Sequence, residues 1–242
     1  MAAPQSAKKS ILSLIVLVVI VTLKFCTDKT KENPSAPAEL SPTSVPEKST
    51  TSSSPSPGKQ LPVKPSVTQK NGWTIYQHCQ LVSHNNNDGD SFRVKLPDGR
   101  GKEFRLYFVD TPESTFKRYR DGNTNAERIS DQARYFGGIT PEASTALGMT
   151  AKKFTLALLE KTPFTVATRN EEVYDSGRFY CHVSIPYEGK TRWLDEILVS
   201  KGYVRIITQP ADLPDGTKAE THRNLLRRME SDAKRNRIGG WQ

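Results

Sequence analysis

A long segment without a single aromatic residue limits where this chain can fold. Residues 27–70 are dominated by Pro, Ser and Thr and contain no Phe, Trp or Tyr. Such a segment cannot bury enough apolar surface to offset the conformational entropy lost on ordering. We therefore predict a disordered linker over residues 27–70 and one folded domain over residues 71–242, which are long enough to build a sizeable core.

The N-terminal segment 1–26 contains an apolar run, residues 11–23, interrupted only by Ser13 and Thr22. Its thirteen residues suit the core of a signal peptide better than a spanning helix, which needs about 20. Because no small-residue cleavage site follows closely, we expect an uncleaved membrane anchor, with a cleaved signal as the alternative. In both cases the domain is expected outside the cytoplasm, membrane-anchored or secreted, although lysines on both sides of the run leave its orientation open.

Neither the charge nor the cysteines of the domain identify a partner by themselves. The chain carries a net charge of +9, but residues 71–242 contain 26 Lys and Arg against 22 Asp and Glu. This excess supports only a weak, salt-sensitive attraction to polyanions. Cys79 and Cys181 are expected to be buried thiols, with a disulfide as the alternative, and no Cys and His spacing resembles a zinc site.

The order of elements predicts a barrel. Three strands come first and form a meander, a helical region follows, and two further strands and two helices complete the domain. We expect an α+β, strand-rich fold: a five-stranded OB-fold barrel with about three helices packed on it. The expected strands are residues 73–83, 91–96, 102–110, 163–169 and 178–185, and the expected helices are residues 125–137, 141–160, 193–201 and one within 217–237.

Charged residues occur where the third expected strand reads as buried. Asp90 and Asp110 fall at the ends of adjacent strands, and two carboxylates that meet in a partly buried site repel unless a hard cation lies between them. Arg105 and Arg178 offer planar forks suited to phosphate oxygens, and Glu113 follows a proline that stiffens the strand exit. The alternatives are turn residues for the aspartates, structural ion pairs for the arginines and a solvated acid for Glu113.

The positions of two of these residues also predict an irregularity. Arg105 and Asp110 have opposite parity, so a regular strand would point them to opposite faces of the sheet. The strand must therefore bend or end before Asp110 if both side chains serve one site.

Several motifs together resemble the staphylococcal nuclease, or thermonuclease, family. They occur in the family's order and spacing, and the likeness covers about residues 72–242. The motifs are DGDS at residues 88–91, FRLYFVDTPES at 104–114, DSGRFY at 175–180, LVSKGYV at 198–204 and IGGW at 238–241.

This resemblance implies a function and a role for each candidate residue. Calcium (Ca2+) would be held by Asp90, Asp110 and the backbone carbonyl of Thr111, with Asp88 outside the direct ligands. Glu113 would act as the general base, and the catalytic arginines would be Arg105 and Arg178. The family hydrolyses DNA and RNA, preferably single-stranded, by breaking the 5'-oxygen to phosphorus bond and leaving 3'-phosphates. We expect a monomer.

The chain departs from the best-known family members near the nucleotide. Ser176 stands where those members have an aromatic residue, for which Tyr174 is a possible substitute, and residues 205–214 lack their tyrosines. Residues 115–136 form a longer basic excursion, either part of the substrate wall or a solvated loop. Two other functions therefore stay open: a non-catalytic nucleic-acid-binding module, and an adaptor whose barrel binds protein.

Overall fold

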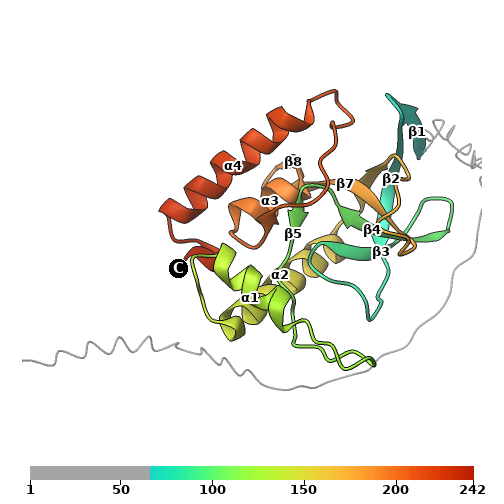
Figure 1. The fold of residues 1–242 in the computed structure, drawn as a ribbon. Helices are drawn as coiled ribbons and strands as arrows, with labels where there is room; N and C mark the ends of the chain where they lie inside the picture. Colours follow the sequence, from blue (N-terminus) through green and yellow to red (C-terminus); the bar gives the residue numbers. More distant parts are fainter. Residues whose placement is uncertain (1–65) are drawn as a thin grey trace, which may run out of the picture. The chain divides into compact units, whose positions relative to one another are not determined.

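A computed structural model describes residues 66–242, which form a closed five-stranded barrel with helices around it (Figure 1). The barrel strands are β2 (Trp73–Leu81), β3 (Ser91–Lys95), β4 (Gly101–Leu106), β6 (Phe164–Thr168) and β7 (Arg178–Tyr187). Strands β2, β3 and β4 pair antiparallel in sequence, β4 pairs parallel with β7, and β6 joins β7 to β2. The predicted OB-type barrel is confirmed. The expected anchor (1–26) and most of the expected linker lie outside the described residues.

Three short strand pairings lie outside this barrel. Strand β1 (Val67–Lys70) pairs with β2, β8 (Lys190–Trp193) with β7, and β5 (Val109–Asp110) with β9 (Arg205–Ile206). Strand β1 lies within the segment expected to be linker. The dipeptide Asn71–Gly72 joins it to β2 with φ values of 52° and 77°, as the two-residue turns favoured in hairpins require.

Residues 66–242 contain four α-helices, one in each of the four expected ranges, so the overall number of about three was one too low. They are α1 (Ala126–Tyr135), α2 (Pro141–Lys161), α3 (Leu194–Ser200) and α4 (Ala219–Arg235), followed by a 3-10 turn, η1 (Gly239–Trp241). Helix α4 lies against α3 at the outside of the fold (Figure 1). No helix in this part of the chain is long and apolar enough to cross a membrane.

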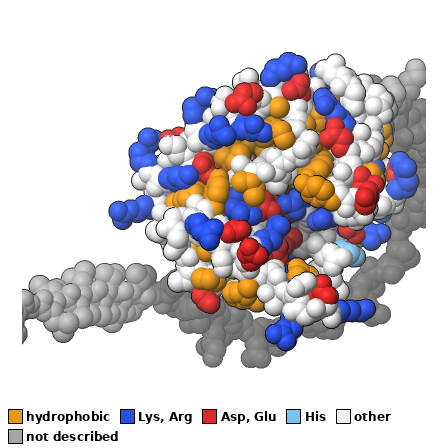
Figure 2. Space-filling view, viewed as in Figure 1, with side chains coloured by type: hydrophobic (Ala, Val, Ile, Leu, Met, Phe, Trp, Pro, Cys, Tyr) orange, Lys and Arg blue, Asp and Glu red, His pale blue; other side chains and the backbone are white. Residues whose placement is uncertain are grey.

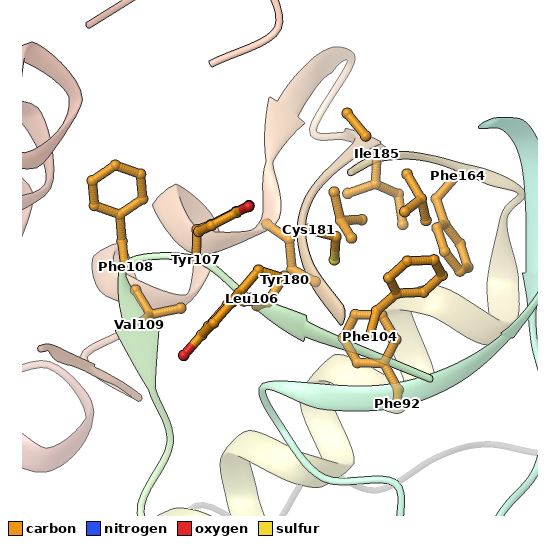
Figure 3. Close-up of a cluster of buried hydrophobic side chains, with 14 of the residues drawn as sticks. Phe92, Phe104, Leu106, Tyr107, Phe108, Val109, Phe164, Tyr180, Cys181 and Ile185 are labelled. Atoms are coloured by element: carbon orange, nitrogen blue, oxygen red, sulfur yellow. The ribbon is translucent and has the colours of Figure 1, made fainter. Parts of the chain in front are cut away.

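The core fills the barrel with large apolar side chains. Figure 3 shows Phe104, Phe164 and Ile185 close together, and all three are fully buried or nearly so. Cys79 and Cys181 are also buried there, and both are free thiols, as expected. Burial raises the pKa of Cys79 to about 12, so this thiol stays protonated at neutral pH.

The strand that carries the candidate site breaks where the sequence requires it. Strand β4 ends at Leu106, Phe108 has a φ of 65°, and β5 resumes at Val109. A positive φ is uncommon for a bulky residue, and burial of the Phe108 ring holds it in place. The break turns Asp110 away from the regular alternation of β4 and pairs it with Arg205 of β9.

Candidate active site

The predicted site residues border two cavities that share a wall. A small cavity of about 230 Å3 is lined by Asp90, Arg105, Thr111, Glu113 and Arg178, among others. Asp110 borders a second cavity of about 570 Å3, which also has Arg105 and Arg178 in its wall. Figure 2 shows acidic and basic side chains intermingled near the middle of this face of the molecule. Residues remote in sequence therefore converge on one region.

Asp110 is buried at the centre of an arginine cluster. Its Oδ1 accepts hydrogen bonds from Nη2 of Arg105 and Nη2 of Arg128, each at 2.7 Å. Its Oδ2 accepts from Nη2 of Arg205 at 2.5 Å and from Nε at 3.1 Å. Burial alone would raise the pKa of Asp110, but the three guanidinium groups hold it below its ordinary value. The carboxylate is therefore ionised under all ordinary conditions.

Asp90 meets Asp110 through a shared arginine. Its Oδ2 accepts from the backbone N–H of Thr111 at 2.7 Å, and its Oδ1 lies 3.4 Å from Nη1 of Arg105. Burial lowers the pKa of Arg105, but Asp90 and Asp110 outweigh it and raise that pKa. Arg105 thus forms structural ion pairs, which were the sequence-based alternative to phosphate binding. It also lines both cavities. Nearby, burial and the charge of Asp90 raise the pKa of Asp88 to about 6.

Glu113 is held from both its backbone and its carboxylate. Its N–H donates to Oε1 of Gln132 at 2.8 Å, and its Oε1 lies 2.9 Å from Nε of Arg128. Its Oε2 lies 3.5 Å from Nζ of Lys117. Helix α2 passes directly behind: a side chain at Gly148 would overlap the carbonyl oxygens of the Pro112–Glu113 segment, so only glycine permits this approach.

Arg178 differs from the three arginines around Asp110 because it pairs with no carboxylate among the described residues. It begins β7, its Nε donates to Oγ of Ser176 at 3.2 Å, and its Nη1 donates to Oγ of Ser91 at 3.5 Å. Within residues 66–242 it forms no ion pair, although it borders both cavities. A guanidinium that has no counter-ion of its own and faces a cavity is available to an external anion such as a phosphate.

Comparison with known proteins identifies the domain. Residues 103–242, more than half of the chain, match the family model described as staphylococcal nuclease homologue. The chain belongs to the staphylococcal nuclease family. The matched range includes Arg105, Asp110, Thr111, Glu113 and Arg178, whereas Asp90 precedes it. A search of curated proteins found no match. Membership gives the barrel a nuclease-like fold and implies nucleic-acid binding.

The donors at the candidate site fit a hard cation by type but not by arrangement. Asp90, Asp110 and the carbonyl of Thr111 offer only oxygen ligands, which calcium prefers. In the part of the chain that the structure describes, however, no group of three or more His, Cys, Asp or Glu side chains is placed to hold a metal. Both oxygens of Asp110 face guanidinium groups, so a cation there must compete with an arginine.

The sequence did not reveal several residues that shape the site. Arg205 meets Asp110 only because two-residue strands pair in one register, which no periodicity in the sequence indicates. Arg128 lies on the exposed side of α1, within the basic excursion of residues 115–136. Asn125, the first residue of the expected helix 125–137, makes no cap bond with its side chain. The side chain instead accepts from the N–H of Lys117 at 2.7 Å and donates to the carbonyl of Thr115 at 2.9 Å.

Proposed function

We propose that this protein is a calcium-dependent phosphodiesterase that hydrolyses DNA and RNA, with preference for single strands and with 3'-phosphate products. The observation that best supports this function is the small cavity, whose wall combines the carboxylate of Glu113, the unpaired guanidinium of Arg178 and the acidic oxygens of Asp90. This combination suits a phosphodiester and an attacking water molecule.

Each of these residues has a defined task in the proposed reaction. Arg178 and Arg105 bind nonbridging oxygens of the phosphate, and their bonds strengthen as negative charge grows on those oxygens in the transition state. Glu113 accepts a proton from the water whose oxygen attacks phosphorus, the bond from phosphorus to the 5'-oxygen breaks, and the 5'-oxygen leaves as a hydroxyl after it takes a proton from solvent water. Calcium bound by Asp90, Asp110 and the Thr111 carbonyl would neutralise phosphate charge and position the water.

Calcium removal provides the direct test of this function. The purified full-length chain should fragment heat-denatured DNA in the presence of calcium and leave it intact when a chelator is added, since the acidic ligands then lack their cation. The new ends should resist extension by a polymerase until a phosphatase removes the 3'-phosphate. Binding of DNA without scission in calcium would contradict the proposal and favour the nucleic-acid-binding module.

Arg128 should weaken calcium binding, because its guanidinium already bridges two of the acids. It lies 2.7 Å from Asp110 and 2.9 Å from Glu113, and its side chain is 48% exposed, against 13% for Arg105 and 10% for Arg205. It is therefore the arginine most free to move away when a cation arrives. Arg128→Ala should tighten calcium binding about fivefold, as expected for loss of a half-exposed pair of about 1 kcal/mol.

Isothermal titration of calcium into the full-length protein measures this effect without turnover. Arg134→Ala is the matched control, because Arg134 lies on the same helix but pairs only with the exposed Asp131. Unchanged or weaker calcium binding in Arg128→Ala would show that Arg128 does not compete with the cation.

We also propose that the enzyme is exported and tethered to a membrane through residues 11–23, where it would degrade nucleic acid near a cell surface. The apolar run and the Pro-rich segment that follows it support this location. The N-terminal sequence of the mature protein decides between an anchor, which keeps residues 11–23, and a cleaved signal, which loses them.

A further inference from the structure

The basic excursion of residues 115–136 begins with a hairpin, residues 115–124, that the proposed reaction does not use. At its tip, the N–H of Tyr119 donates to the carbonyl of Asn123 at 2.8 Å, and Arg118 and Thr124 form an isolated bridge. At its base, the side chain of Asn125 binds the backbone of both Thr115 and Lys117. Figure 1 shows this segment projecting from the start of α1 away from the barrel. It is thus a hydrogen-bonded element with a defined shape.

The hairpin presents aromatic and basic side chains to solvent. Phe116 is 52% exposed and Tyr119 is 50% exposed, so neither contributes fully to the core. Three cations are interleaved with them, while the one acid, Asp121, is hydrogen-bonded within the hairpin to Asn123. The cations are Lys117, Arg118 and Arg120. Exposed aromatic rings between cations are the groups that bind bases and phosphates of single-stranded nucleic acid.

The exposed aromatic residues lie near the candidate active site. Within residues 66–242, the exposed large aromatic side chains are Phe116, Tyr119 and Tyr174. Tyr174 borders the 570 Å3 cavity together with Arg178. The hairpin adjoins the 230 Å3 cavity, because Lys117 lines that cavity and lies 3.5 Å from Glu113. One exposed aromatic residue therefore lines the larger cavity of the candidate active site, and two belong to the hairpin that adjoins the smaller one.

We propose that the hairpin of residues 115–124 binds single-stranded nucleic acid beside the active site. The rings of Phe116 and Tyr119 stack on unpaired bases, and the three cations pair with the phosphates between them. A duplex keeps its bases stacked on one another, so the hairpin favours single strands. This inference rests on the proposed function and deepens it, because it assigns the preference for single strands to the residues of this hairpin.

The test compares two probes that differ only in their bases. Full-length protein with Glu113→Gln, which keeps the probe intact, is titrated in calcium into a labelled oligothymidylate of about 20 nucleotides and into an abasic strand of equal length. Phe116→Ala/Tyr119→Ala should weaken binding of the oligothymidylate at least about tenfold, since stacking contributes substantially for each base. Binding of the abasic strand, which retains every phosphate, should be unchanged.

The control removes exposed apolar side chains elsewhere. Val67→Ala/Ile238→Ala, on β1 and next to η1, should leave both affinities unchanged. Equal affinity of the hairpin variant and the parent for oligothymidylate would overturn the inference, as would an equal loss for both strands. It would also be overturned if the hairpin variant bound oligothymidylate normally but lost binding to phosphatidylserine vesicles, which would indicate a membrane-facing surface.

The outcome is separable from that of the proposed function. If the native protein fails to cleave DNA but the hairpin variant still loses affinity for oligothymidylate alone, the hydrolytic function is rejected and the stacking surface stands. If the native protein cleaves DNA and the hairpin variant binds oligothymidylate normally, the hydrolytic function stands and the stacking surface is rejected.

Discussion

Glu113→Gln should lower the rate of DNA hydrolysis by about 10²–10⁴-fold while the protein still binds DNA. The amide has nearly the same shape as the carboxylate but cannot take a proton from the attacking water. The backbone of Glu113 stays in place because its N–H bond to Gln132 and its contact with α2 do not involve the carboxylate. Single-turnover cleavage of labelled DNA in saturating calcium measures the chemical step separately from binding.

A control on the neighbouring helix distinguishes this effect from a general loss of acid. Glu127→Gln changes an exposed acid in the first turn of α1 that makes no ion pair in the described residues, and it should leave the rate unchanged. If Glu113→Gln retained more than about a tenth of the native rate, Glu113 would not be the general base. The reaction would then need another proton acceptor in the cavity.

Local patterns in the sequence were sufficient to predict the barrel and its break. Alternating apolar residues predicted the strands, and the opposite parity of Arg105 and Asp110 predicted the end of β4 before Asp110. Strand β1 lies within the segment expected to be linker, because composition alone does not indicate the Asn71–Gly72 turn that brings β1 onto β2. The turn can be recognised in the sequence, since Asn-Gly flanked by alternating hydrophobic residues is the strongest short-range signal for a hairpin.

The surroundings of the site depend on contacts that sequence patterns do not encode. Asp110 could be recognised from its motif, but its partner Arg205 is 95 residues away and meets it through strands of two residues. Arg128 comes from an insertion that the family motifs do not describe, and it reaches Asp110 only because α1 folds back over the end of β5. Motifs thus predicted which residues converge on the cavities, whereas tertiary packing determined which charges balance them.

That balance of charges predicts a large effect on stability. Asp110→Ala should lower the free energy of unfolding by about 3–5 kcal/mol, because it leaves the largely buried guanidinium groups of Arg105 and Arg205 without their closest counter-ion. Urea unfolding in the presence of a chelator measures this loss without a contribution from bound metal.

A second substitution tests whether the uncompensated charge causes the loss. Arg205→Met in the Asp110→Ala background removes one of the two buried cations and retains an apolar side chain of similar length, so it should recover part of the lost stability. In the native background the same substitution should destabilise, because Asp110 then loses two hydrogen bonds. A loss below about 1 kcal/mol for Asp110→Ala would instead place these ion pairs in the range of solvent-screened surface pairs. The arginine cluster would then serve ligand binding alone, since it would contribute little to folding.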